Sequence, residues 1–118
     1  MINVITISHK QQRYDTVGDW QFSESGALQI TVSEMSDWRF EMLIAIHEIV
    51  EAILCKQAGI SQEEVDEFDI KFTGEGEPGN AYNCPYYVQH MIATSVELLV
   101  AQGLKVDWQK YSKEIEKL

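Results

Sequence analysis

The stretch IAIHEIVEAIL, residues 44–54, places one histidine and two glutamates inside an otherwise apolar run. A carboxylate is costly to bury unless a partner neutralises it. In a helix, at 100° per residue, Glu51 lies about 40° and Glu48 about 100° from His47, so the three share one face. These residue types at this spacing could hold a metal ion and supply a base beside it.

A second segment, PYYVQHMIATSVELLVAQ, residues 85–102, adds another histidine. If it is a helix, Tyr86 and Glu97 fall within about 40° of His90 on one face. Tyr86 is a candidate to donate a hydrogen bond to a developing oxyanion. Glu97 is a candidate to orient His90 by a hydrogen bond from behind.

Packing the two faces together would unite three ligands, His47, Glu51 and His90, of the kind that hold catalytic zinc with a fourth position open for water. Glu48 would then be free to act as the general base. In the better-known HExxH arrangement two histidines bind zinc, whereas here Glu51 replaces the second one. The alternative is a buried hydrogen-bonded pair of His47 and Glu51 without metal, completed by Arg39 or Tyr86.

Two long helices must position these side chains. The apolar run predicts a helix from an N-cap at Ser36 to about Ala58, ended by Gly59. Pro85 opens the second helix, which Gly103 ends near residue 102. The face of the second helix opposite His90 is expected to be plain core; it bears Val88, Ile92 and Leu99.

Three strands are expected before the helices, at residues 2–8, 19–23 and 27–33, because these runs are β-branched and bounded by turn residues. A capping box of Ser61 and Glu64 predicts a short helix ending near Asp69, and Asp107 caps a last short helix. The loop at residues 73–84 can overhang the site. We therefore expect an α+β fold in which a small antiparallel sheet packs on two long helices and a short C-terminal helix.

Three further residues near these elements are expected to have no functional role. Asp69 and Glu77 are predicted to be solvated acids in a cap or loop, and His9 a surface residue. The two cysteines, Cys55 and Cys84, show no metal or redox spacing and are expected to be buried reduced thiols.

Length and charge limit the class of protein. The chain of 118 residues is one domain, residues 1–118, and is long enough to fold without a metal, so a metal would serve function. Nine basic against 19 acidic residues give a net charge of −10, which argues against binding nucleic acid. No membrane span or signal peptide is evident, and a cytoplasmic location is expected. The oligomeric state is left open.

The elements HEIVEAILC, EEVDEFD, GEPG and PYYVQHMIATSVE followed by VDWQKY resemble those of small uncharacterised proteins of bacteriophages and prophages, over nearly the whole chain. This resemblance implies the cytoplasm of a bacterial host. The strand and the HExx helix that follows it are similar to zincin-type metalloproteases. The zincin resemblance implies His47, Glu51 and His90 as metal ligands and Glu48 as base.

Three functions are consistent with these features. The first is a zinc-dependent, peptidase-like hydrolase in which Glu48 activates a zinc-bound water, acting on a peptide or protein. The second is a non-catalytic phage accessory or binding protein with a structural or degenerate site, whose acidic surface suits a basic partner. The third is a magnesium-dependent nucleotide pyrophosphatase that would use two acidic pairs, Glu48 with Glu51 and Glu63 with Asp66.

Overall fold

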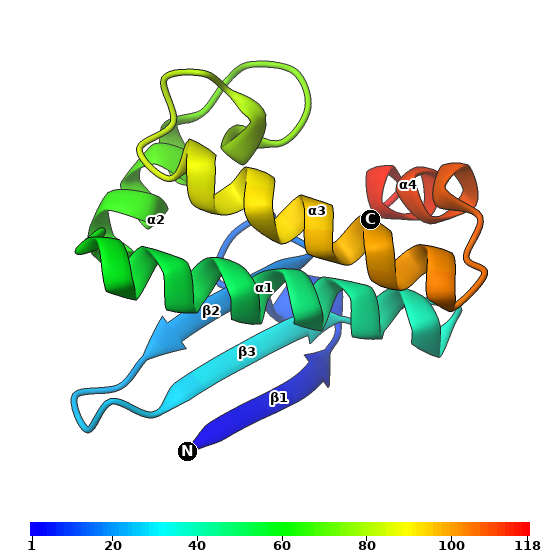
Figure 1. The fold of residues 1–118 in the computed structure, drawn as a ribbon, viewed down its shortest axis with the longest axis horizontal. Helices are drawn as coiled ribbons and strands as arrows, with labels where there is room; N and C mark the ends of the chain where they lie inside the picture. Colours follow the sequence, from blue (N-terminus) through cyan, green and yellow to red (C-terminus); the bar gives the residue numbers. More distant parts are fainter.

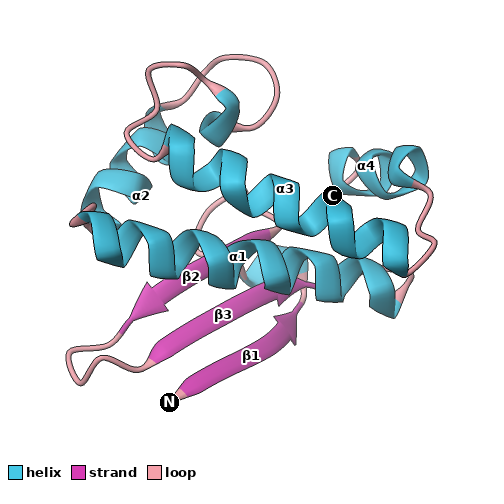
Figure 2. Cartoon of the chain, viewed as in Figure 1, coloured by secondary structure: helices cyan, strands magenta, loops and turns pink.

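The computed structural model describes all residues, 1–118, as an α+β domain with a three-stranded sheet and four α-helices. The strands are β1 (Ile2–Ile7), β2 (Gly18–Phe22) and β3 (Leu28–Ser33), and β3 lies in the centre (Figure 2). The sequence-based strands agree with these to within one residue at most ends. The turn at residues 23–27 joins β2 to β3, as the sequence predicts.

The sheet is mixed, so the expectation of an antiparallel sheet is wrong for one of its two pairs. β2 pairs antiparallel with β3, but β1 pairs parallel with β3, with Ile2 opposite Leu28 and Ile7 opposite Ser33. A tight turn forces neighbouring strands to be antiparallel only where it joins them directly. Residues 8–17, which include the short 3₁₀ helix η1 (His9–Gln11), are long enough to carry the chain past the end of β3.

Helix α1 (Trp38–Ala58) begins one residue later than expected. Asp37 is its N-cap and accepts a hydrogen bond from the backbone N–H of Arg39, a role predicted for Ser36. Ser36 instead bonds the carboxylate of Glu114. Gly59 ends the helix with φ of 75°, a left-handed conformation that glycine adopts without strain, as predicted.

The remaining helices are α2 (Gln62–Lys71), the 3₁₀ helix η2 (Pro78–Asn80), α3 (Tyr87–Gly103) and α4 (Trp108–Glu116). The capping box before α2 and the Asp107 cap of α4 are both confirmed. α3 begins after Pro85, with Tyr86 as its N-cap, and Gly103 is its last helical residue. Lys105, at φ of 57°, makes the left-handed turn that was expected of Gly103.

α1 lies between the sheet and α3, packed along α3 on one side and on β2 and β3 on the other (Figure 1). The core fills the space between α1 and the sheet with large side chains that include Ile30, Val32 and Leu43, all inaccessible to water. No helix is long and apolar enough to cross a membrane.

The face of α3 that was expected to be core is exposed. Val88, Ile92 and Leu99 are 60%, 45% and 67% accessible. The reason is that α3 packs mainly on α1 and η2, on the side that carries His90 and Glu97, and no element covers its opposite side. Apolar periodicity alone does not distinguish a covered face from an uncovered one.

Candidate metal centre

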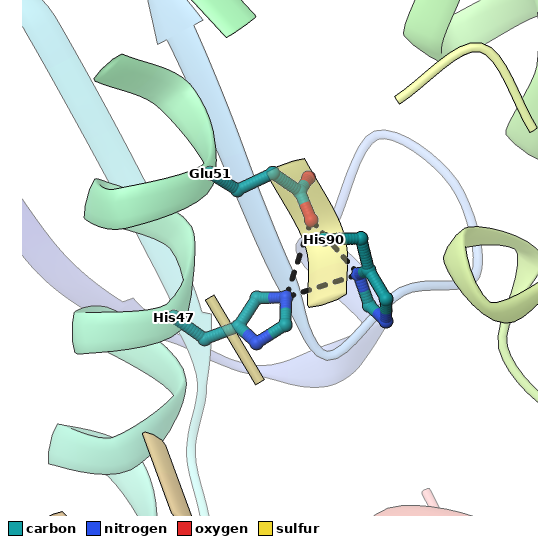
Figure 3. Close-up of side chains that lie close together, drawn as sticks. All are labelled: His47, Glu51 and His90. Atoms are coloured by element: carbon teal, nitrogen blue, oxygen red, sulfur yellow. Dashed lines mark hydrogen bonds and ion pairs between the residues drawn. The ribbon is translucent and has the colours of Figure 1, made fainter. Parts of the chain in front are cut away.

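Three side chains from two helices converge on one point inside the protein (Figure 3). Nε2 of His47 lies 3.2 Å from Oε2 of Glu51 and 3.2 Å from Nδ1 of His90, and Nδ1 of His90 lies 2.9 Å from the same Glu51 oxygen. All three residues are buried. The packing of α1 on α3 thus unites the three side chains that the sequence nominates as metal ligands.

Glu97 holds His47, and the prediction that it orients His90 is wrong. Its Oε1 lies 2.7 Å from Nδ1 of His47, and its Oε2 accepts a hydrogen bond of 2.6 Å from the hydroxyl of Tyr111 in α4. A carboxylate in this position favours the tautomer with its proton on Nδ1. The lone pair of Nε2 then points into the cluster, which is the arrangement by which carboxylates orient metal-binding histidines.

The outer nitrogen of His90 faces the loop that was expected only to overhang the site. Oε2 of Glu77 lies 3.2 Å from Nε2 of His90, within ion-pair distance although outside the direction of a hydrogen bond. Glu77 was predicted to be a solvated acid; its side chain is 54% exposed, but it reaches His90. Gly79 packs against the His90 ring so closely that a Cβ there would lie 2.4 Å from two ring atoms.

The second oxygen of Glu51 has a partner from the sheet. Nε1 of Trp20, in β2, donates a hydrogen bond of 3.1 Å to Oε1 of Glu51. Trp20 was not identified from the sequence, because an aromatic residue in a strand is ordinarily core. The tryptophan fixes the carboxylate so that its other oxygen faces the two histidines.

The pKa values of the histidines and Glu51 in this cluster depend strongly on one another. Burial alone would lower the pKa of His47, but hydrogen bonds with Glu51 and Glu97 raise it to about 11. The pKa of His90 is raised to about 9 because its contacts with Glu51 and Glu77 likewise outweigh burial. Burial would raise the pKa of Glu51, yet the two histidines lower it to about 2. Without metal, the cluster therefore binds protons in place of a cation.

Glu48 is the carboxylate of the site that accepts no hydrogen bond. Its side chain is 12% exposed, its Oε2 is 4.0 Å from Nε2 of His47, and it accepts no hydrogen bond from the protein. Burial, and then the charge of Glu51, raises the pKa of Glu48 well above its usual range. Gly18, at the start of β2, makes room for it, since a Cβ there would lie 2.7 Å from Cγ of Glu48. A general base works best with a pKa near the working pH, and an upward shift moves a carboxyl in that direction.

A cavity of about 280 Å³ opens beside the cluster and is lined by Glu48, Glu51, His47 and His90. Tyr86 and Asp69 also line it, but the Tyr86 hydroxyl already donates to Oδ1 of Asp69, while Tyr14 donates to Oδ2 at 3.1 Å. Asp69 was predicted to be solvated; burial instead raises its pKa to about 6. The oxyanion role of Tyr86 stays a prediction, and it would require the hydroxyl to leave Asp69.

Neither of the residues proposed to complete a metal-free network joins the cluster. Arg39 pairs with Asp37 and with the carbonyl of Leu104, and Tyr86 bonds Asp69. His9 is half-buried, between Ser33 and Asp15, and not simply a surface residue.

The donor set fits a transition-metal ion. With the outer nitrogens of His47 and His90 facing Glu97 and Glu77, the three inner atoms lie 2.9–3.2 Å apart, and each would offer a lone pair once a metal ion displaced the protons of the cluster. Ligand atoms of a tetrahedral site with bonds of about 2.0–2.1 Å lie roughly 3.3 Å apart. Two imidazoles and one carboxylate suit zinc or Fe(II) better than magnesium or calcium, which prefer oxygen.

Fold and site define an α+β protein with a buried cluster of two histidines and one glutamate on two packed helices, whose donor atoms lie close enough together that they could hold a metal ion. Comparison with protein-family models, with curated proteins and with solved structures finds no match.

Replacing Gly79 by alanine should weaken metal binding. The new methyl group would overlap the His90 ring, so either the ring or η2 must move. We expect at least about a tenfold loss of zinc affinity, the lower end of the range for altered support of a ligand. Competition with a chromophoric chelator measures it. Gly103→Ala is the control because nothing lies within 4 Å of its Cβ position; equal affinities in the two variants would contradict the role of Gly79.

Replacing Glu97 by glutamine should lower zinc affinity by about 10–100-fold, because the amide removes the charge that supports His47. Tyr111→Phe, which leaves the carboxylate but removes its hydroxyl partner, should cause a smaller loss. The same chelator titration measures both. Unchanged affinity in the Glu97 variant would show that the carboxylate does not support a ligand.

The metal-free protein should lose stability as the pH rises from about 6.5 to 11, with both histidines contributing up to about 9 and His47 alone above it. A group whose pKa is raised on folding stabilises the fold below its unfolded value and loses that contribution as the pH approaches its folded value. For His90 and His47 these folded values are about 9 and 11, and each group contributes up to ~1.4 kcal/mol per pH unit in its window. Urea unfolding at several pH values measures the loss. Zinc-loaded protein, with imidazoles already deprotonated, should lack this slope.

Proposed function

We propose that this protein is a metal-dependent, peptidase-like hydrolase that holds zinc through His47, Glu51 and His90. The observation that carries the proposal is the position of Glu48. A mostly buried carboxylate that accepts no hydrogen bond and lies 4.0 Å from Nε2 of His47 stands beside three converging donor atoms and lines the same cavity. A purely structural metal site would not need such a residue, which is costly to bury.

Zinc bound at such a donor set lowers the pKa of a water molecule and polarises a substrate carbonyl. The chain's own residues supply the remaining steps. Glu48, with its raised pKa, takes the proton from the water as the water attacks the carbonyl carbon, and then delivers that proton to the departing amine. His47 and His90 are kept in orientation by Glu97 and Glu77 while this proton moves.

The non-catalytic alternative predicts a different behaviour at Glu48. If the cluster only stabilises the fold, a neutral residue at position 48 should raise stability and change nothing else. The pyrophosphatase alternative has less support, because the N-terminal third is a sheet and Asp66 is paired with Arg13 at 2.9 Å. The cytoplasmic location and the phage origin remain proposals of the sequence.

The proposal is tested with the zinc-loaded protein on unfolded casein and on a library of short peptides, with release of new amino groups as the readout. We expect cleavage that a chelator abolishes and that added zinc restores. Cleavage that persists in chelator would contradict the role of metal. No cleavage of either substrate by fully zinc-loaded protein would contradict a peptidase-like activity.

A further inference from the structure

The uncovered face of α3 forms a continuous apolar surface. Its exposed large side chains are each more than a third accessible and lie on one arc of the helix; they are Tyr87, Val88, Met91, Ile92, Leu98 and Leu99. Ser95 and Gln102 complete the arc. Their combined exposed area is on the order of 500 Å², toward the upper end of the largest patch on a typical monomer. We refer to these eight residues as the α3 face.

The α3 face is free of charge in a strongly acidic protein. The only acidic or basic side chains among the 17 residues of α3 are His90 and Glu97, and both are buried toward α1. The chain as a whole carries a net charge of −10. Two copies of this chain repel each other unless they meet at a neutral face.

Part of the face has the spacing of a helix–helix seam. Val88, Ile92, Ser95, Leu99 and Gln102 follow one another at intervals of four, three, four and three residues. This 3.5-residue period is the pattern by which two helices pack along their whole length. Ser95, in the middle, is small enough for the helices to approach closely.

We propose that the α3 face binds a second copy of this chain, with the two α3 helices antiparallel about a two-fold axis near Ser95. Such a pairing buries on the order of 1,000 Å² in total, the smallest area that a specific interface requires. It places Ile92 of each copy beside Leu99 of the other. A lipid bilayer is a poorer occupant, because α3 itself carries no lysine or arginine to attract anionic headgroups.

The pairing leaves the metal cluster accessible from its cavity. Figure 1 shows α3 on the outer side of α1, away from the strands, and the face points away from α1. The cavity is lined from the loop between β1 and β2, from β2, α1, α2, the loop around η2 and the end of the chain at α4, with Tyr86, His90 and Glu97 contributed from the α3 segment; none of the eight residues of the α3 face lines it. The dimer therefore does not depend on metal binding or on catalysis.

Sedimentation equilibrium of the untagged protein over a range of concentrations tests the proposal. We expect a monomer–dimer equilibrium for the wild type. Ile92→Glu should shift it to monomer, whereas Ile70→Glu, the same change at an exposed site on α2, should leave it unchanged. Ile92 is exposed, so its replacement should not disturb folding, and circular dichroism checks this. A monomeric wild type, or equal association of the two variants, would overturn the proposal.

A mixing experiment tests the pairing itself. Ile92→Glu and Leu99→Lys should each be monomeric alone and should form a mixed dimer when combined, because the pairing sets Glu against Lys. Restored association in the mixture supports the antiparallel seam, and its absence overturns that register. Co-sedimentation of wild-type monomer, but not Ile92→Glu, with phosphatidylcholine vesicles would overturn self-association in favour of a lipid surface.

Discussion

Alanine at either His47 or His90 is expected to abolish stoichiometric metal binding, whereas alanine at His9 is expected to leave it intact. The chain has three histidines, and only these two direct a nitrogen at the shared oxygen of Glu51. With one imidazole lost, only two ligands remain, too few for a stable zinc site. His9 serves as the control because it lies in the loop between β1 and β2, bonded to Ser33 and Asp15.

The measurement is plasma mass spectrometry on the four untagged proteins after zinc has been offered and unbound metal removed. The same analysis identifies the metal, since iron would be retained by the same donors. We expect near-stoichiometric zinc in wild type and His9→Ala and little in the other two. No metal in any protein would make a metal-free hydrogen-bonded cluster the better description, and metal loss from all three variants would contradict the assignment of His47 and His90 as the specific ligands.

A second effect of these substitutions separates metal loss from misfolding. His47 and His90 are buried against carboxylates, so their removal also leaves Glu51, Glu97 or Glu77 without its partner. We expect the metal-free variants to be less stable than metal-free wild type by about 3 kcal/mol, the lower end of the range for breaking a buried ion pair. Urea unfolding measures this. Folded variants that bind no metal establish that the histidines are ligands.

The sequence predicts the ligand cluster because the information is local. His47 and Glu51 lie one turn apart on an apolar helix, and His90 shares a face with small residues that allow close packing. The residues that support the ligands are harder to predict from the periodicity of one helix. Trp20 and Glu77 reach the cluster from a strand and a loop, and only the tertiary arrangement brings them there. Glu97 was identified but assigned to the wrong histidine.

The two errors of fold have one cause. The parallel pairing of β1 and the exposure of the α3 face both depend on which elements meet in space, and neither follows from the residues of one element. Helix caps are short-range interactions, so the cap at Asp107 and the box at Ser61 were predictable, while the cap expected at Ser36 lies one residue later and the turn expected at Gly103 two residues later. Only the part of the site that lies on one face of a helix could be predicted from the sequence.

Glutamine at Glu48 is expected to lower hydrolysis by about 10²–10⁴-fold while zinc remains bound. The amide keeps the shape of the side chain and its packing on Gly18 but cannot accept the proton of water. Glu48 lies 4.0 Å from the nearest nitrogen of His47 and is not one of the three converging groups, so the metal should stay. Glu63→Gln, on the exposed side of α2, is the matched control.

The same variant should be more stable than wild type under either role, and the loss of turnover that accompanies the gain is what separates a catalytic role from a structural one. Burial makes the charged form of Glu48 unfavourable, and no hydrogen bond offsets that penalty. Removing the charge should therefore raise the urea midpoint at neutral pH, while kcat falls and zinc content is unchanged. A general base is expected to behave in this way, because it is needed for turnover although it lowers stability. Full activity in this variant would exclude Glu48 as the base even if zinc is bound.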